Sequence, residues 1–195
     1  MLEIGGRRIR MSEQKARERV KNFRSVPLGY TVEQAMAEAQ RCIQCEYAPC
    51  ERHCPVRMKI KVIIRRIAVG DFRTAYMIAK QDNPIPAIAG LVCPQEDQCE
   101  GVCPLACHEQ GINIGKLEAF IAQWAMENGV KEEFRIAERP EKIAIIGSGP
   151  AGISCAVDLR RHGYQVTVFE ALHMAGGVLQ YGIPAFRLPK NIVDY

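Results

Sequence analysis

Residues 41–55 read RCIQCEYAPCERHCP, and residues 93–104 read CPQEDQCEGVCP. The two cysteine runs have the spacings Cys42-x2-Cys45-x4-Cys50-x3-Cys54-Pro and Cys93-x5-Cys99-x3-Cys103-Pro. Seven thiols within about sixty residues indicate a metal centre, because thiolates are soft ligands that suit iron–sulfur clusters, zinc or cuprous copper.

Both runs end on Cys-x3-Cys-Pro, as bacterial ferredoxin runs do, and there the cysteine before proline binds the other cluster. This crossover predicts one [4Fe–4S] cluster held by Cys42, Cys45, Cys50 and Cys103. A second would be held by Cys54, Cys93 and Cys99, with Cys107 or Glu118 as fourth ligand. Spacing alone favours Cys107, because thiolate is the commoner ligand. The alternatives are structural zinc, which prefers two close cysteine pairs, and a single cluster with idle thiols.

The second motif is a glycine loop, Gly147-Ser148-Gly149-Pro150-Ala151-Gly152. It follows an apolar strand predicted for residues 143–146 and opens a helix predicted for residues 150–161. Glycines at these positions allow a tight turn, backbone approach to a pyrophosphate and packing of the helix on the strand. The free N–H groups at the helix start favour a phosphate there. The alternative is a Rossmann turn that binds no phosphate.

Three further features extend the predicted nucleotide site. Glu170 ends the next predicted strand, residues 165–169, where it would accept hydrogen bonds from ribose hydroxyls and favour FAD or NAD over NADP. Gly177, with Val178 beside it, would bring backbone close to a flavin, and Arg187 could face a phosphate. The alternative for these last residues is a surface loop rich in glycine and proline.

The periodicity of the rest predicts an α-helical N-terminal iron–sulfur domain followed by the start of an α/β Rossmann-like FAD-binding domain. Helices are expected over residues 11–22, 32–41, 60–69, 72–81 and 112–126, and Thr31 and Gln34 form a capping box. The predicted domains are residues 1–127 and 141–195, joined by a linker over residues 128–140. One β-α-β unit cannot cover both faces of a parallel sheet, so we expect either a fragment or completion by another polypeptide.

The composition narrows the class of protein. The chain has 195 residues, nine cysteines and a formal net charge of +4. It has no apolar run of membrane-spanning length and no signal peptide at its first residues, so we expect a cytoplasmic protein without disulfides that binds neither membrane nor nucleic acid. No residue has the setting of a catalytic acid, base or nucleophile, so the chemistry is expected to belong to cofactors.

In this order the motifs resemble the glutamate synthase small-subunit-like flavoproteins. That family includes the large subunit of electron-bifurcating NADH-dependent ferredoxin:NADP oxidoreductase and the N-terminal part of dihydropyrimidine dehydrogenase. The resemblance rests on residues 41–45, 50–55, 92–96, 112–118, 146–152 and 182–189. It implies that Glu118, rather than Cys107, completes the second cluster, and that the glycine loop, Glu170 and Arg187 bind FAD.

The resemblance also implies the electron-transfer part of an NAD(P)H-dependent oxidoreductase, in which FAD and two [4Fe–4S] clusters pass electrons to a partner in a hetero-oligomer. The expected partner is a glutamate synthase large subunit, and a ferredoxin-linked subunit of the bifurcating type is the alternative. A non-catalytic iron–sulfur carrier is the alternative of another class. Family members continue with an NAD(P)H domain, so direct NAD(P)H binding is expected only in the complete enzyme.

Overall fold

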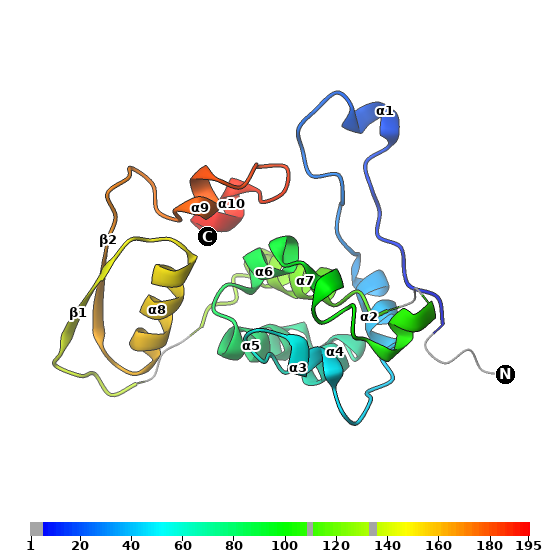
Figure 1. The fold of residues 1–195 in the computed structure, drawn as a ribbon, viewed down its shortest axis with the longest axis horizontal. Helices are drawn as coiled ribbons and strands as arrows, with labels where there is room; N and C mark the ends of the chain where they lie inside the picture. The colour runs from blue at the N-terminus through cyan, green and yellow to red at the C-terminus, as the bar shows by residue number, and fades with distance from the viewer. Residues whose placement is uncertain (1–5, 109–110, 133–135) are drawn as a thin grey trace. The chain divides into compact units, whose positions relative to one another are not determined.

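The computed structural model describes residues 6–108, 111–132 and 136–195. The chain divides into two compact units, Met1–Val130 and Lys131–Tyr195 (Figure 1). The first unit is helical and contains both cysteine runs, and the second contains the glycine loop. The predicted architecture, a helical region followed by the β-α-β start of a Rossmann-like domain, is confirmed.

The helical unit consists of seven α-helices among its described residues: α1 (Ala16–Arg19), α2 (Val32–Gln40), α3 (Pro49–His53), α4 (Ile60–Ala68), α5 (Phe72–Asp82), α6 (Pro86–Val92) and α7 (Ile114–Glu127). Two short 3₁₀ helices span Gln95–Asp97 and Pro104–His108. The capping box predicted at the start of α2 is confirmed, because Thr31 and Gln34 exchange hydrogen bonds of 3.2 and 3.0 Å. Asp71 caps α5 by accepting the Thr74 amide at 3.3 Å. These caps fix where the helices around the cysteine runs begin.

Helix α7 lies at the centre of the helical core and packs against α2, α4, α5 and α6. Leu117 and Ile121 of α7 and Ile60 and Ile67 of α4 are almost fully buried. Helix α6 approaches α7 closely, since a Cβ atom on Gly90 would lie 2.5 Å from the Ala119 backbone nitrogen. The core therefore fixes α6 and α7, between which the second cysteine run lies in the sequence.

The helix predicted over residues 11–22 is wrong, because only Ala16–Arg19 is helical. The apolar side chains of this stretch do not pack against the core, since Val20 is 79% exposed and Phe23 is 88% exposed. The chain instead forms an arm, residues 11–30, whose two sides pair through Gln14 N to Val26 O and Leu28 N to Ser12 O, both 2.9 Å. Figure 1 shows α1 at the tip of this arm.

The second unit begins with the predicted β-α-β unit. Strands β1 (Lys142–Ile146) and β2 (Gln165–Phe169) are parallel and joined by α8 (Pro150–Arg161). Their register pairs Ile143 with Val166 and Ile146 with Phe169. Two short helices follow, α9 (Val178–Tyr181) and α10 (Lys190–Asp194). The glycine loop and Glu170 each directly follow one of two parallel strands. They therefore lie at the same end of the sheet, the carboxyl end of its strands.

The sheet has only two strands among the described residues, and α8 packs against both. Ile146 remains 84% exposed and Phe169 54% exposed. A parallel sheet normally has both faces covered, so the described part of this unit presents apolar side chains that it does not itself bury. Among the described residues, no helix is long and apolar enough to span a membrane.

Candidate functional site

The first thiol group combines residues from both cysteine runs. Cys42 follows α2, Cys50 lies on α3 and Cys103 precedes the second 3₁₀ helix. These three thiols and Cys45 line one small pocket, which is closed by Lys61, by Pro104 and by five apolar side chains, Ile43, Ile64, Leu105, Ile112 and Ile114. The structure thus brings together the four thiols that the crossover assigns to the first cluster.

The backbone around this pocket has an unusual conformation. Among the described residues, the three non-glycine residues with positive φ all lie in or just after the first run: Gln44 (50°), Ala48 (39°) and Arg57 (54°). Such conformations cost about 1–3 kcal/mol each and persist at sites where surrounding structure imposes them. The Gln44 side chain donates to Cys42 Sγ at 3.3 Å and to the Lys61 carbonyl at 3.3 Å. Gln44 therefore ties the cysteine loop to α4.

The environment of these thiols suits a cationic centre. Burial raises the pKa of Cys42, and the nearby Cys103 and Cys45 raise it further, against a lowering by hydrogen bonds from Gln44. Burial also raises the pKa of Cys50 to about 12, with contributions from Glu51 and Cys45. Metal binding requires thiolates and releases their protons. Bound iron would supply the positive charge that this buried donor set needs.

The second thiol group forms around the start of α7. Cys54 ends α3, Cys93 ends α6 and Cys99 is buried just after the first 3₁₀ helix. Burial raises the pKa of Cys93, and the charges of Glu118 and Cys54 raise it further. Burial raises the pKa of Cys99 to about 12, with Glu100, Cys54 and Glu118 adding to the shift. Cys54 and Glu118 are thus close enough to act electrostatically on both other thiols.

Glu118 and Cys107, the two candidates for the eighth ligand, lie in very different places. Glu118 is only 6% exposed, and its Oε1 accepts a 2.8 Å hydrogen bond from the side chain of Asn83, which is itself buried. Burial raises the pKa of Glu118 to about 8. Cys107 is exposed, and its thiol donates to the Pro104 carbonyl at 3.0 Å. A ligand is commonly oriented by a hydrogen bond to a second residue, and Glu118 has one in Asn83.

All nine cysteines are free thiols in the structure, and the ninth, Cys155, is exposed on α8. Within the described part of the chain, no three His, Cys, Asp or Glu side chains are arranged to hold a single metal ion.

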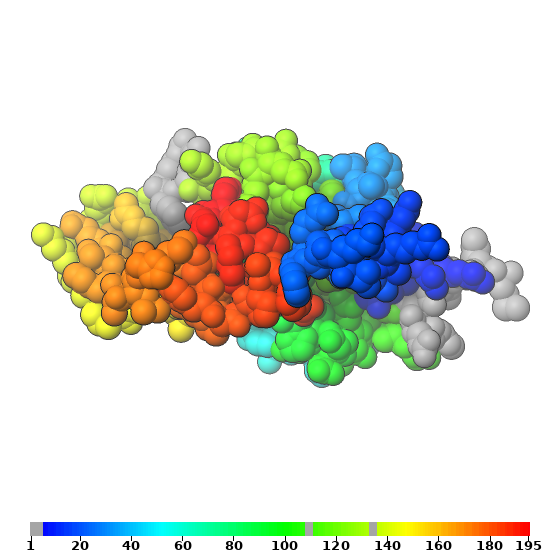
Figure 2. Space-filling view, turned by 90° about the horizontal axis from the view of Figure 1, so that it is seen from above, coloured from blue at the N-terminus to red at the C-terminus, as the bar shows by residue number. Residues whose placement is uncertain are grey.

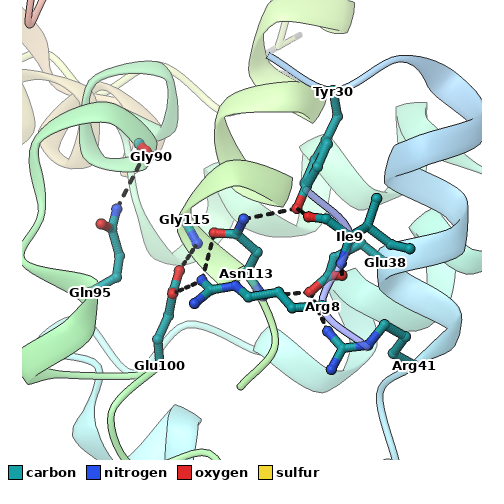
Figure 3. Close-up of polar contacts among 10 residues, drawn as sticks. All are labelled: Arg8, Ile9, Tyr30, Glu38, Arg41, Gly90, Gln95, Glu100, Asn113 and Gly115. Carbon is teal, nitrogen blue, oxygen red and sulfur yellow. Dashed lines mark hydrogen bonds and ion pairs between the residues drawn. The ribbon is translucent and has the colours of Figure 1, made fainter. Parts of the chain in front are cut away.

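A buried polar network connects the two cysteine runs (Figure 3). Glu38 of α2 is fully buried and accepts three hydrogen bonds, from Ile9 N at 2.8 Å, Arg41 Nη1 at 2.7 Å and Asn113 N at 2.8 Å. Arg41 directly precedes Cys42. Glu38 therefore fixes the start of the first run against the residue that precedes α7.

The same network reaches the second run through Arg8. The Arg8 guanidinium pairs with Glu100, which directly follows Cys99, and donates to Asn113 Oδ1 at 2.8 Å. Glu100 also accepts the Gly115 amide at 2.9 Å, and Tyr30 accepts from the Asn113 side chain at 2.8 Å. Sequence reasoning missed this network. One available signal was the spacing of Glu38 and Arg41, which allows an i,i+3 ion pair beside a ligand cysteine.

The glycines of the loop in the second unit differ in whether the surrounding protein leaves room for a side chain. Gly147 has φ +95° and donates to the Phe169 carbonyl at 2.7 Å. A Cβ atom on Gly152 would lie 2.1 Å from the Gly147 carbonyl, so the turn itself requires that glycine. A Cβ atom on Gly149 would meet nothing within 4 Å. Its open surroundings leave room for a ligand to approach the backbone at the start of α8.

Ser148 joins the glycine loop to Glu170. Its amide donates to Glu170 Oε2 at 3.0 Å, and its hydroxyl donates to the same oxygen. The Ser148 hydroxyl and the Leu172 and Ser148 amides lower the pKa of Glu170 to about 2, and the residue is half-buried. Ser148 Oγ also accepts the Gly176 amide at 3.0 Å. The carboxylate is therefore charged and held at the mouth of the glycine loop.

The glycine pair lies against this loop, because a Cβ atom on Gly177 would be 2.9 Å from Gly149 Cα. Gly177 itself has φ +54°. Val178 is 57% exposed at the start of α9. Arg187 is exposed and makes no side-chain hydrogen bond with the loop in the described part of the chain. The structure therefore brings together the glycine loop, Glu170 and Gly177, but it does not bring Arg187 into contact with them.

Fold and site together define a class of protein: a helical unit with two groups of thiols, followed by the start of a dinucleotide-binding β-α-β domain. The family model described as dihydropyrimidine dehydrogenase domain II, 4Fe-4S cluster, matches residues 19–130. A second model, described as NAD(P)-binding Rossmann-like domain, matches residues 145–195. Because the first match covers more than half of the chain, the chain belongs to the family of this 4Fe-4S domain.

Curated relatives combine the same two regions. The chain is 39% identical over 181 residues to the putative oxidoreductase UacF of Escherichia coli, covering 92% of this chain and 28% of that protein. It is 36% identical over 181 residues to the glutamate synthase [NADPH] small chain of Azospirillum brasilense, and the match covers 92% of this chain and 38% of that protein. It is 36% identical over 160 residues to the E. coli NAD-dependent dihydropyrimidine dehydrogenase subunit PreT, and the match covers 82% of this chain and 39% of that protein. The chain thus spans 28–39% of the length of these relatives.

Proposed function

We propose that this chain is the electron-transfer segment of an NAD(P)H-dependent oxidoreductase that contains FAD and two [4Fe–4S] clusters. The observation that carries the proposal is the pocket lined by Cys42, Cys45, Cys50 and Cys103, because it combines thiols from both cysteine runs. When bound, the cofactors would accept a hydride at FAD and release electrons singly through the clusters. The protein's own contribution is to hold, orient and desolvate them.

The proposed ligands of the first cluster are Cys42, Cys45, Cys50 and Cys103, which line one pocket. Those of the second are Cys54, Cys93, Cys99 and Glu118. The second set is supported by the influence of Cys54 and Glu118 on the pKa values of Cys93 and Cys99, and by the hydrogen bond from Asn83 to Glu118. An oxygen ligand would make the second centre electronically different from the first, because ligand type tunes a cluster's potential.

The proposed FAD site is formed by the glycine loop, Glu170, Gly177, Val178 and Arg187. The α8 N-terminus supplies free amides for a pyrophosphate, and the charged Glu170 supplies acceptors for ribose hydroxyls. A Gly149→Ala substitution tests this role, since a methyl group there meets no protein atom within 4 Å but would meet a bound pyrophosphate. We expect the variant to fold normally and to lose FAD. Retention of FAD by the variant would contradict the site.

The proposed partner is a second redox subunit. The match to glutamate synthase small chains covers 92% of this chain, which favours a glutamate synthase large subunit as partner. The equal identity to PreT supports a dihydropyrimidine dehydrogenase partner as the second candidate. A ferredoxin-linked subunit of the electron-bifurcating type is the third. Glutamine- and 2-oxoglutarate-dependent oxidation of NADPH by the complete enzyme with its partner would single out the first.

The direct test is anaerobic purification followed by measurement of iron, acid-labile sulfide and flavin per chain, together with the visible spectrum. We expect about eight irons, consistent with two four-iron centres. A Glu118→Ala variant should lose part of this iron, whereas Cys107→Ala should retain it. Zinc in place of iron would overturn the redox function, and iron loss in Cys107→Ala alone would transfer the ligand role to Cys107.

A further inference from the structure

Residues 7–24 have a larger net positive charge than the chain as a whole. This stretch contains eight arginine or lysine residues and two glutamates, a net charge of +6, whereas the whole chain has +4. The remaining residues therefore have a net charge of −2, before any contribution from anionic clusters. A positive region on an otherwise slightly negative protein directs the approach of an acidic partner.

The N-terminal part of this basic segment lines a solvent-open hollow of about 930 Å³. Its described lining residues are Arg7, Arg8, Ile9, Arg10, Met11, Glu13 and Asn113. Arg8 is held in place by Glu100 and Asn113. Arg7 and Arg10 are exposed, and no ion pair involves them within the described residues. The Arg8 guanidinium is thus fixed in the wall of the hollow, whereas those of Arg7 and Arg10 are available to bind carboxylates.

The arm, residues 11–30, begins at this hollow and has several apolar side chains that are exposed to solvent. Val20, Phe23 and Leu28 are 79%, 88% and 60% exposed. Hydrogen bonds keep its tip folded, since Asn22 Nδ2 donates to the Glu18 carbonyl at 2.7 Å and Asn22 Oδ1 accepts the Arg24 amide at 2.9 Å. Figure 2 shows the arm, in blue, at the surface of the molecule. A structured projection with exposed apolar side chains is typical of an interaction element.

We propose that the hollow and the arm together form a docking site for an acidic segment of a protein partner. Arg7 and Arg10 would pair with carboxylates of that segment, and Phe23 would enter an apolar socket beside it. Aromatic and arginine side chains are enriched in protein interfaces and among the residues that dominate binding. Nucleic acid is disfavoured as the occupant, because single strands are bound by several stacking aromatics and this arm exposes one, Phe23, beside the aliphatic Val20 and Leu28.

The position of the site gives it a role in electron transfer, and this step rests on the proposed function. Arg8 lines the hollow and pairs with Glu100, the residue next to Cys99. A segment seated in the hollow would therefore lie two side chains from the second thiol group. The docked partner is accordingly the one that exchanges electrons with the second cluster.

The test measures binding of a fluorescent, glutamate-rich peptide with interspersed leucines to the whole reconstituted chain by anisotropy. Controls are the same peptide with glutamine for glutamate and an oligothymidylate of equal charge. We expect the acidic peptide to bind best. The double variant Arg7→Glu/Arg10→Glu should weaken this binding about tenfold or more, and Phe23→Ala should weaken it several-fold at higher salt, where ionic contacts are screened.

The matched control is Arg65→Glu/Arg73→Glu, which reverses two exposed charges on α4 and α5 of the same unit. Equal weakening by this control, tighter binding of the oligothymidylate, or unchanged binding by Phe23→Ala would each overturn the proposal. Iron and sulfide are determined on the same samples. A chain that contains clusters but does not bind the peptide contradicts only the docking site, whereas a chain without iron contradicts the proposed function and leaves the binding result to be judged separately.

Discussion

The helical unit buries its core, whereas the α/β unit leaves most of its apolar surface open. The large cluster of buried side chains lies entirely within residues 30–130. In the described part of residues 131–195, only Leu179 and Leu188 are buried hydrophobic residues, and α8 has none. Helices can cover one another, but a two-stranded parallel sheet needs more strands and a second layer of helices. The contrast shows that the helices around the cysteine runs bury a common core, whereas the described part of the α/β unit buries few apolar side chains.

The largest expected effect concerns independent folding. We expect residues 1–130, reconstituted with iron and sulfide, to unfold in one cooperative transition in urea, because this segment has a complete core. Residues 131–195 alone should show no cooperative transition, because too little apolar surface is buried to offset the chain entropy. Circular dichroism during urea titration checks both. A sharp transition for residues 131–195 would contradict the comparison.

The next effect concerns the buried network of the helical unit. Replacing Glu38 by alanine leaves Arg41 buried without its carboxylate and removes the acceptor of the Ile9 and Asn113 amides. Removing one partner of a buried ion pair typically costs about 3–5 kcal/mol of unfolding free energy. Urea denaturation measures the loss. The control is Glu33→Ala on the exposed face of the same helix, which should change stability far less. Similar losses for the two variants would contradict a structural role for the network.

The third effect compares a glycine-to-alanine substitution in the helical unit with one in the α/β unit. Gly90→Ala places a methyl group against the backbone of α7, where neither helix can move without disturbing the core. Overpacking of this kind costs about 1–3 kcal/mol. Gly149→Ala in the open unit should leave stability nearly unchanged, since nothing lies within 4 Å of the added atom. Thermal unfolding of both variants checks the pair, and equal destabilisation would show that the α/β unit is packed as tightly as the helical one.

The smallest effect concerns the half-buried carboxylate of Glu170. Its pKa is lowered to about 2, first by the Ser148 hydroxyl, from an ordinary value of 4.5. A lowered pKa stabilises the folded state above pH 4.5, and this contribution is lost as the pH falls from 4.5 towards 2. Ser148→Ala should therefore raise the pKa of Glu170, as measured by carboxyl carbon chemical shifts against pH. An unchanged pKa would assign the shift to the backbone amides instead.

Local sequence signals predicted much of the fold. The Thr31 capping box, the bounds of α8 and the strand Gln165–Phe169 agree with the structure. Each depends on residues close in the chain, where capping, glycine and alternation are decisive. The crossover rule of the Cys-Pro endings also predicted which four thiols line one pocket. Their role as cluster ligands stays a prediction.

Features that depend on distant contacts were missed. Helix α6 was not predicted, because its stability comes from the close approach of Gly90 to α7. The helix over residues 11–22 was overpredicted, because its charged composition suits a helix but no apolar surface receives Val20 or Phe23. Burial of Glu38 was not foreseen, since a glutamate within a helix is usually exposed. The basic stretch 7–24 is visible in the sequence, but it was overlooked because the whole chain has only a modest charge.

The central claim is that each cluster takes ligands from both cysteine runs, and paired cysteine variants test it most directly. The double variant Cys42→Ala/Cys103→Ala removes two ligands from different runs but from one proposed cluster, so we predict about four irons and one cluster signal by electron paramagnetic resonance. The double variant Cys42→Ala/Cys54→Ala removes two ligands from the same run, and it should damage both clusters. Loss of both clusters in the first variant, with retention of one in the second, would contradict the crossover.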